Sequence, residues 1–439
     1  MSALEEKIRN KSATVGVIGL GYVGLPLVAG FARSGFPVLG FDIDATKVAA
    51  LEANRSYIAH FPGAVLEELH RLRRFTATSD FSRLKEADAI IVCVPTPLTA
   101  HREPDLSYVR STANQIAAAA RPGQLIVLES TTYPGTTEEI LLPELERAGL
   151  RLDRDIFLAF SPEREDPNNP NFTLQTIPKV VGGVTPRSGQ MAALLYGAVV
   201  RSIVPVANAR VAEASKLVEN IFRCVNIALV NELKICFDKM GIDVWDVLEA
   251  AATKPFGFMK FEPGPGLGGH CIPIDPFYLT WKAREYGVAT RFIELAGEVN
   301  AAMPEWVVHR VADALNARGR SLKGSRILIL GVAYKKNVDD IRESPALQVI
   351  ELLLARGSEV AYDDPHVPRL HKMRRYDLKL VSQELEEKTL AQYDAVIIIT
   401  DHDRVDYALV ARHSRLLVDT RSALRKRQIT AAPEKMVLG

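Results

Sequence analysis

Residues 15–27 read VGVIGLGYVGLPL, and this stretch decides the fold. An apolar run is followed by glycines in the G-x-G-x-x-G spacing, Gly19, Gly21 and Gly24, and then by a helical pattern. Glycines placed there let the backbone approach a pyrophosphate at a positive helix N-terminus. Asp42 ends the next apolar run, where a carboxylate accepts both ribose hydroxyls and repels a 2′-phosphate. We therefore expect NAD rather than NADP. A Rossmann-shaped domain that binds nothing is the alternative.

The same plan of strands recurs in the second half of the chain. Four apolar runs of the first half have counterparts in the second, at 326–334, 359–365, 393–403 and 415–421. Because helical patterns alternate with these runs, they predict buried parallel strands. The expected fold class is α/β, with two Rossmann-like doubly wound parallel-sheet domains joined by a long central helical segment. The expected domains are an NAD-binding domain (1–204), a helical dimerisation region with a cysteine loop (205–308) and a second Rossmann-like ligand-binding domain (309–439).

Composition excludes several classes of protein. The chain has 439 residues, of which 54 are basic and 53 acidic, so its net charge of +1 argues against nucleic-acid binding. Its four cysteines lack disulfide or zinc spacing, and no metal is expected. The charged N-terminus does not resemble a signal peptide, and no apolar run is long enough to cross a membrane. A cytoplasmic protein is expected.

The C-terminal half has lost the glycine fingerprint. Its first strand is followed by GVAYKKNVDDIRESP, in which Lys335, Lys336 and Arg342 lie near a strand's carboxyl end. An anionic ligand is expected there, because open α/β sheets bind ligands at that edge. The alternative is a solvated run of charges with internal ion pairs, for example between Lys336 and Asp340.

The stretch 208–243 has helical apolar periodicity with no Gly or Pro before Gly241, which predicts long helical structure suited to dimerisation, with more than one helix packed together. Glu213, Lys216 and Asn220 share one face of this helix. Lys and Asn there can stabilise an oxyanion. A buried ion pair that serves helix packing is the alternative.

Cys271 lies in GPGLGGHCIPIDPFYL, residues 264–279. Glycines leave the loop's backbone bare and prolines stiffen it, so the thiol is suited to meet a ligand. His270 either activates the thiol or fixes the loop, and Asp275 is a candidate acid/base or water-orienting group. The other cysteines, 93, 224 and 236, are expected to be structural, in apolar surroundings.

Six ordered motifs resemble one known family. They are GLGYVGLPL, SPE at 161–163, AEASKLVEN, PGPGLGGHCIP, YKKNVDDIRESP and the paired DP and DTR segments. Over essentially the whole chain they are similar to the UDP-glucose/GDP-mannose dehydrogenase family. GHCIPIDPFYLTWKA is most similar to its UDP-N-acetylhexosamine 6-dehydrogenase branch, in bacterial surface-polysaccharide pathways.

The resemblance implies oxidation of a sugar's C6 alcohol to a carboxylate with two NAD. Cys271 would hold the intermediate first as a thiohemiacetal and then as a thioester. A homodimer or higher homo-oligomer is also implied. The implied catalytic residues are Cys271, Lys216, Asn220, Asp275, Glu163 and Thr131. Those implied to bind NAD are Gly19, Gly21, Tyr22, Val23, Gly24, Asp42, Lys47, Pro95, Thr96, Thr131 and Arg342. Those implied to bind the UDP-sugar are Glu163, Arg164, Lys216, Asn220, Phe256, Phe261, Gly266, Gly268, Tyr334 and Lys335.

Two departures from the family pattern bear on the substrate. Ile274 stands where the UDP-glucose branch usually has lysine, and TKPFGF (253–258) replaces a segment that commonly supplies an arginine to a neighbouring subunit. Both favour UDP-GlcNAc over UDP-glucose, while UDP-GalNAc and UDP-ManNAc stay open, as does the division of roles between Glu163 and Glu165. A one-step hydroxyacid dehydrogenase, an epimerase and a nucleotide-sensing scaffold are the other functions considered.

Overall fold

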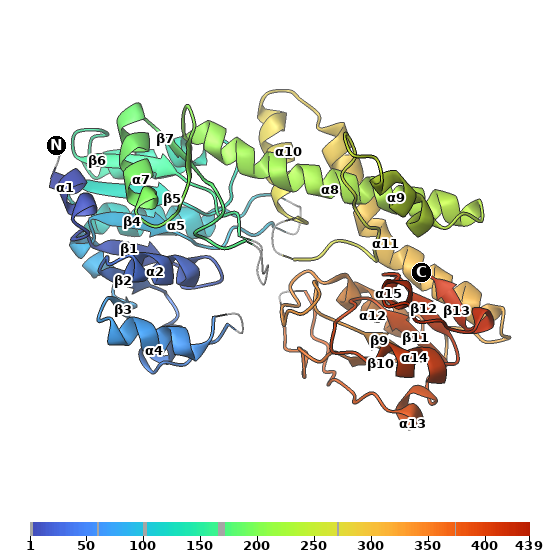
Figure 1. Ribbon diagram of the computed structural model, residues 1–439. Coiled ribbons are helices and arrows are strands. Elements are labelled where there is room, and N and C mark those ends of the chain that lie inside the picture. Colours follow the sequence, from blue (N-terminus) through green and yellow to red (C-terminus); the bar gives the residue numbers. More distant parts are fainter. Residues whose placement is uncertain (1–2, 59–60, 100–102, 166–171, 270–271, 374) are drawn as a thin grey trace. The chain divides into compact units, whose positions relative to one another are not determined.

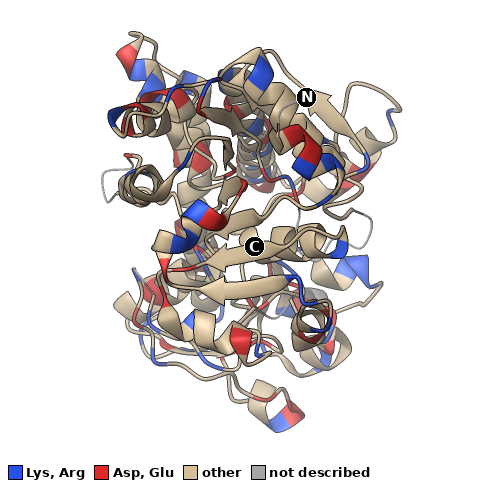
Figure 2. Cartoon of the chain, turned by 90° about the vertical axis from the view of Figure 1, so that its left-hand side faces the viewer, with Lys and Arg blue, Asp and Glu red and all other residues tan. Residues whose placement is uncertain are grey.

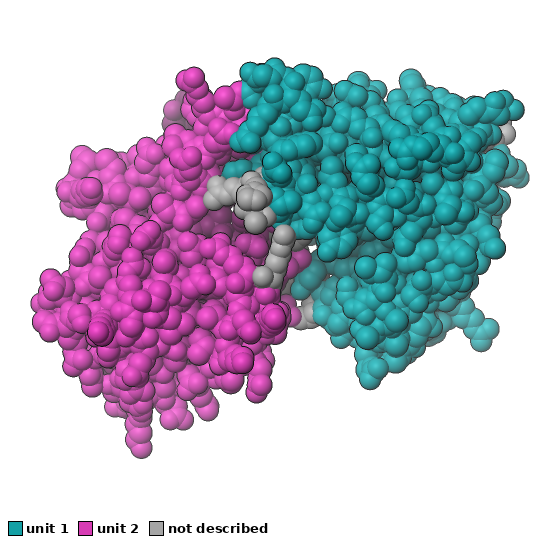
Figure 3. All heavy atoms as spheres, turned by 180° about the vertical axis from the view of Figure 1, so that it is seen from behind, with its two compact units in different colours: residues 1–219, 277–288 teal, residues 220–276, 289–439 magenta. Residues whose placement is uncertain are grey.

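The computed structural model describes residues 3–58, 61–99, 103–165, 172–269, 272–373 and 375–439. The chain divides into two compact units, coloured separately in Figure 3. Unit 1 comprises residues 1–219 and 277–288, and unit 2 comprises residues 220–276 and 289–439. Among the described residues, no helix combines the length and the apolar character needed to span a membrane.

Unit 1 is built on an eight-stranded sheet (Figure 1). Its strands are β1 (Val15–Ile18), β2 (Val38–Phe41), β3 (Phe75–Thr78), β4 (Ala89–Val92), β5 (Gln124–Leu128), β6 (Ile156–Phe160), β7 (Lys179–Gly183) and β8 (Ile203–Pro205). They lie in the order β3-β2-β1-β4-β5-β6-β7-β8. Every neighbouring pair is parallel except β6 and β7, which run antiparallel. The predicted parallel sheet is therefore confirmed for β1 to β6, while β7 and β8 run in the opposite direction.

Helices cover both faces of this sheet. They are α1 (Ala3–Arg9), α2 (Gly24–Arg33), α3 (Ala45–Glu52), α4 (Gly63–Arg71), α5 (Ser107–Ala119), α6 (Leu142–Arg147) and α7 (Pro186–Gly197). Alternate strand residues enter two cores: Val17 packs in the cluster that contains α2 and α7 residues, and Ile18 in the one that contains α5 residues. Because both faces are covered, the strands are continuous apolar runs rather than alternating ones.

Unit 2 contains a five-stranded parallel sheet in the order β10-β9-β11-β12-β13. Its strands are β9 (Arg326–Leu330), β10 (Glu359–Asp363), β11 (Ala395–Ile398), β12 (Leu417–Asp419) and β13 (Met436–Leu438). Its helices include α9 (Val244–Ala252), α11 (Arg291–Asn316), α12 (Pro345–Ala355), α13 (Glu387–Leu390), α14 (Tyr407–His413) and α15 (Ala423–Lys426). The second α/β half predicted from the repeated strand plan is confirmed.

Two helices contribute residues to both units. Helix α8 (Ala209–Lys239) is a single helix of 31 residues, so the predicted long helix is confirmed, while the expectation that this stretch forms more than one packed helix is wrong. It ends just before Gly241, whose φ of 70° suits glycine. The other is α10 (Asp275–Glu285), which begins four residues after Cys271.

Candidate active site

The candidate residues of unit 1 follow the carboxyl ends of neighbouring strands. Gly19 follows β1, Thr96 comes after β4, Thr131 after β5 and Glu163 after β6. Strands β1, β4, β5 and β6 are adjacent and parallel, so these segments share one edge of the sheet. Ligands of open α/β sheets bind at this edge.

The three glycines after β1 have different surroundings. Gly19 has a φ of 93°, which favours glycine, and a Cβ there would overlap the carbonyl of Cys93. A Cβ on Gly24 would overlap the carbonyl of Gly19, so this glycine lets α2 begin close to β1. No atom of the described residues lies within 4 Å of a Cβ placed on Gly21. The open space beside Gly21 fits a dinucleotide pyrophosphate, which packs against bare backbone in this motif.

Asp42 is held rigidly at the end of β2. Its Oδ2 accepts a hydrogen bond from the backbone N–H of Leu20 at 3.1 Å and lies 3.7 Å from Nζ of Lys47, while its Oδ1 accepts from the N–H of Asp44 at 3.0 Å. The Tyr57 hydroxyl donates to the carbonyl of Leu20 at 2.5 Å. Asp42 and Lys47 are thus brought together beside the glycine turn, as a ribose-binding pair requires.

Glu213 anchors the turn that carries Thr131. Its fully buried carboxylate accepts hydrogen bonds from the N–H of Gly135 at 2.5 Å and from the N–H and hydroxyl of Thr137 at 2.9 and 2.7 Å. Burial raises the pKa of Glu213 to about 7, opposed by these donors. Glu213 therefore serves the 130–137 turn, and the alternative of an ion pair with Lys216 on the same helix face is wrong for this carboxylate.

Glu163 and its neighbours form a fixed group after β6. Oε1 of Glu163 accepts from the backbone N–H groups of Arg164 and Glu165, both at 2.6 Å. Its Oε2 lies 3.2 Å from Nζ of Lys179. Arg164 pairs with Glu219 at 2.7 Å, and Glu165 accepts from the N–H of Leu174 at 2.5 Å. The Glu163 carboxylate thus forms an ion pair with Lys179, a buried lysine that the sequence analysis did not select.

In unit 2, two predicted catalytic residues touch. Nδ2 of Asn220 donates to Oδ2 of Asp275 at 2.5 Å, although 55 residues separate them. Asp275 is buried, with 2% of its surface exposed. Cys271 and His270 lie outside the described residues. Thr131, Glu163, Arg164 and Lys216 belong to unit 1.

The glycines before Cys271 pack against the segments that follow β9. A Cβ on Gly268 would lie 2.7 Å from Cβ of Tyr334, and one on Gly269 would lie 2.8 Å from the ring of that tyrosine. The N–H of Gly269 donates to the carbonyl of Arg342 at 3.0 Å. The structure therefore brings the predicted substrate residues Gly268 and Tyr334 together.

Phe256 and Phe261, the two phenylalanines predicted to bind the substrate, lie in different surroundings. Phe261 packs edge-on against Phe222, with the ring centroids 5.7 Å apart, and it also packs with the cluster around Trp245. Phe256 is 71% exposed. Gly266 lies close to Pro345 and Pro304.

The charged residues after β9 form ion pairs both with one another and with residues outside this segment. Arg342 binds the Asp340 carboxylate, with Nη2 and Oδ2 2.6 Å apart. Lys336 pairs with Asp403 at 2.6 Å rather than with Asp340, so the suggested ion pair of Lys336 is wrong.

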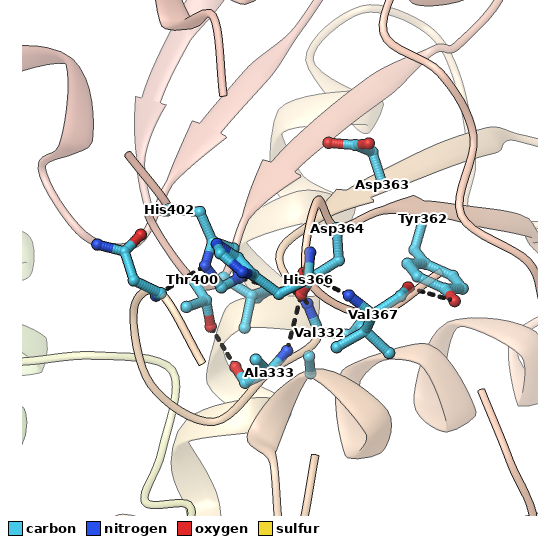
Figure 4. A network of polar contacts seen from close by, with 12 residues as sticks. Val332, Ala333, Tyr362, Asp363, Asp364, His366, Val367, Thr400 and His402 are labelled. Carbon is cyan, nitrogen blue, oxygen red and sulfur yellow. Dashed lines mark hydrogen bonds and ion pairs between the residues drawn. The ribbon is translucent and has the colours of Figure 1, made fainter. Parts of the chain in front are cut away.

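A polar network missed by the sequence analysis holds this run in place. Oδ2 of Asp364 accepts from the N–H groups of Val332 and Ala333 at 2.8 and 3.0 Å and lies 3.0 Å from Nε2 of His402 (Figure 4). Nδ1 of His402 accepts from the N–H of Asn337 at 2.9 Å. Asp364 comes just after β10, as Asp42 comes just after β2. A residue-by-residue comparison of the two halves is the signal that could have found Asp364.

One expectation about the cysteines is corrected. Cys224 is buried and Cys93 half-buried, but Cys236 is exposed, on a face of α8 that the apolar periodicity did not separate from its neighbours. Among the described residues, no group of three or more His, Cys, Asp or Glu side chains is placed to hold a metal. Acidic and basic side chains are interspersed along the chain (Figure 2).

Comparisons with known proteins agree with this architecture. Models of the UDP-glucose/GDP-mannose dehydrogenase family match residues 13–200 (NAD binding domain), 210–302 (central domain) and 328–426 (UDP binding domain). A UDP-N-acetyl-D-glucosamine 6-dehydrogenase of Pseudomonas aeruginosa is 36% identical over 89% of this chain and 91% of its own. An NDP-N-acetyl-D-galactosaminuronic acid dehydrogenase of Ralstonia nicotianae is 34% identical over 95% and 98%.

A solved structure is similar over nearly the whole chain. The UDP-D-ManNAc dehydrogenase of Pyrococcus horikoshii superposes with a TM-score of 0.87 at 31% identity, covering 96% of this chain and 98% of that one. These relatives act on different amino sugars, so similarity alone leaves the sugar open. The glycine turn, the Asp42 carboxylate and the three family matches together confirm the expected NAD and UDP-sugar ligands. The chain belongs to the UDP-glucose/GDP-mannose dehydrogenase family, whose members are NAD-dependent nucleotide-sugar 6-dehydrogenases.

Proposed function

We propose that this enzyme oxidises the C6 alcohol of UDP-N-acetylglucosamine to the carboxylate. The observation that carries the chemistry is the hydrogen bond between Asn220 and Asp275, two predicted catalytic residues, of which Asp275 lies four positions after Cys271 in the chain. The choice of sugar is supported by Ile274. This side chain is only 9% exposed, so an apolar residue occupies the position at which the UDP-glucose branch usually has lysine.

The residues around the glycine turn are suited to hold NAD. NAD held there would supply the hydride acceptor for each of the two oxidations at C6. Gly21 leaves room for the pyrophosphate, and Asp42 with Lys47 is placed to bind the adenosine ribose. The other residues proposed to contact the cofactor are Gly19, Tyr22, Val23, Gly24, Pro95, Thr96, Thr131 and Arg342.

Cys271 keeps the half-oxidised sugar on the enzyme. Its thiolate adds to the C6 aldehyde to give a thiohemiacetal, and loss of the second hydride converts this to a thioester. Water then adds to the thioester carbonyl, Glu163 accepts the water's proton, and the C–S bond breaks to release the carboxylic acid and the thiolate. Lys216 and Asn220 stabilise the oxyanions, while Asp275 and Thr131 orient the water.

The UDP-sugar is assigned to the glycine loop and to the segment after β9. The apposition of Gly268 and Tyr334 within unit 2 supports this assignment. The residues proposed to contact the substrate are Glu163, Arg164, Lys216, Asn220, Phe256, Phe261, Gly266, Gly268, Tyr334 and Lys335.

Side-by-side assays with UDP-GlcNAc, UDP-GalNAc, UDP-ManNAc and UDP-glucose test the function. We expect the highest kcat/KM with UDP-GlcNAc, and two NADH per sugar when the sugar is limiting, measured by absorbance and by product mass. An epimerase would accumulate no NADH, and a one-step dehydrogenase would make one. UDP-glucose as the best substrate would overturn the choice of branch, and no NADH from any sugar would overturn the proposed function.

A homodimer built on α8 is part of this proposal. Val211, Val218, Phe222 and Leu229 are each at least 43% exposed, and their spacing places them on one face of the helix. An apolar face of this kind is suited to pack against a second copy. Light scattering is expected to give about twice the chain mass of 48.4 kDa. A single-chain mass at micromolar concentration would contradict this.

The wider setting follows from the reaction. We infer a cytoplasmic enzyme that makes a precursor for bacterial surface polysaccharide, because NAD and UDP-sugars are both supplied there. We also infer three functional domains, 1–204, 205–308 and 309–439, a division supported by the ranges of the three family matches.

A further inference from the structure

The antiparallel strand β7 brings a lysine to the edge of the sheet where Glu163 lies. Phe160 of β6 pairs with Gly182 of β7, and Ala159 pairs with Gly183. Continuing this register past the end of β6 places residue 179 opposite residue 163. Lys179 is the first residue of β7, so this reversed strand carries its amino end to the carboxyl edge of the parallel strands.

Lys179 bridges two carboxylates in the interior of unit 1. Its Nζ is hydrogen-bonded to Oε1 of Glu129, which follows β5, and lies 3.2 Å from Oε2 of Glu163. The hydroxyl of Tyr196, on α7, donates to Oε2 of Glu129 at 3.0 Å. The side chains of Lys179 and Glu129 are 4% and 0% exposed. We call Glu129, Lys179 and Glu163 the buried triad.

The triad holds one positive charge between two acidic groups. Burial alone would raise the pKa of Glu163, but Lys179 and two backbone amides bring it below its ordinary value. Burial raises the pKa of Glu129 to about 7, opposed by Lys179 and reinforced by Glu163. The thiol of Cys93, which follows β4, and the hydroxyl of Tyr196 are further titratable groups that interact with Glu129.

We propose that Lys179 is a positioning residue for Glu163, and that the charge on Glu129 tunes the strength of Glu163 as a base. This rests on the proposed function, in which Glu163 deprotonates the water that cleaves the thioester. Lys179 fixes one oxygen of Glu163 and keeps the group ionised in a buried position. When Glu129 is neutral, Lys179 interacts with Glu163 alone, and Glu163 is the weaker base. When Glu129 ionises, it shares the ammonium group, and Glu163 becomes the stronger base.

Substitution of Lys179 tests the positioning role. In Lys179→Met we expect thioester hydrolysis at pH 7 to slow by about 100-fold, comparable to the loss of a general base. The acyl-enzyme should accumulate in rapid-quench mass spectrometry. Raising the pH should restore activity, because Glu163 without its lysine has a higher pKa and ionises only at higher pH. Lys179→Arg, which keeps the charge, should recover part of the rate.

Substitution of Glu129 gives a test that does not depend on Lys179→Met folding. Glu129→Gln mimics the neutral carboxyl group, so the ratio of its hydrolysis rate to that of the wild type should be near one at pH 5.5. The ratio should fall several-fold as the pH rises through about 7, where Glu129 ionises in the wild type. A purely structural defect would lower the ratio equally at every pH.

The controls separate this inference from the proposed function. Lys282→Met removes another buried lysine of unit 1 that bridges two carboxylates, Glu139 and Glu285. It should lower the melting temperature without moving the pH profile of hydrolysis. Glu163→Gln should accumulate the thioester, and its failure to do so would remove Glu163 from the mechanism. If Glu163→Gln accumulates the thioester while the Glu129→Gln ratio is flat with pH, or while Lys179→Met hydrolyses it at the wild-type rate, this inference alone is overturned.

Discussion

Cys271→Ser is expected to lower the rate of the complete oxidation, from the C6 alcohol to the carboxylate, by about 10⁴-fold or more. Removal of a covalent nucleophile costs this much in enzymes that depend on one. A serine hydroxyl is a far weaker nucleophile than a thiolate at neutral pH. The aldehyde would not be captured, and the second oxidation would fail. A stopped-flow assay with limiting UDP-GlcNAc should show at most one NADH per sugar in place of two.

The chain offers a matched control for this substitution. Cys236 is exposed on α8 and is assigned no role in the reaction, so Cys236→Ser should turn over at the wild-type rate. Two NADH per sugar from Cys271→Ser would exclude the thioester route. The chemistry would then resemble that of dehydrogenases that oxidise an aldehyde without a covalent intermediate.

The glycine turn and Asp42, at the carboxyl ends of β1 and β2, could be predicted because they belong to one continuous sequence motif. The run from Val15 to Gly24 combines buried-strand composition with glycines at three fixed positions, and Gly24 is required by its close approach to Gly19 within the same turn. Asp42 was predictable for the same reason, because the end of the second strand is adjacent to the glycine turn in every such unit. These features depend on residues close in sequence or on a known crossover geometry.

The buried triad could not be predicted, because its members are brought together by a strand whose direction the sequence does not encode locally. Lys179 precedes the apolar run VVGG and resembles an ordinary lysine at the exposed start of a strand. Its partner Glu129 lies 50 residues earlier. Only the antiparallel pairing of β6 and β7 turns this lysine inward, toward Glu163. Strand order and direction at the end of a sheet depend on tertiary packing rather than on local propensity.

The same reasoning applies to Asp364 and His402. The repeated strand plan places Asp364 after the second strand of its half, as Asp42 follows the second strand of the first half. It did not show that the second carboxylate would be used by the protein's own amide groups and by a histidine 38 residues later. Asp42 accepts a hydrogen bond from one N–H group of the turn that follows β1. Asp364 accepts hydrogen bonds from two N–H groups of the segment that follows β9. The C-terminal half has thus kept the position of the carboxylate and changed its partner.

A pair of alanine substitutions separates the two uses of glycine in the N-terminal turn. In Gly24→Ala the new methyl group would overlap the carbonyl of Gly19 and crowd Val17, where the backbone cannot yield cheaply. We expect a loss of about 3 kcal/mol or more in the free energy of unfolding, as for severe overpacking. The melting temperature without NAD should fall clearly below that of the wild type.

Gly21→Ala is expected to leave that melting temperature unchanged, because its methyl group would point into open space. The same space is where a pyrophosphate would pack, so the Kd for NAD measured by calorimetry should rise about tenfold or more, equivalent to about 1.4 kcal/mol. NAD should therefore raise the melting temperature of the wild type and fail to raise that of Gly21→Ala. Wild-type affinity in Gly21→Ala would show that the cofactor does not approach this turn, because no atom in the described part of the chain lies within 4 Å of the position that the methyl group would fill.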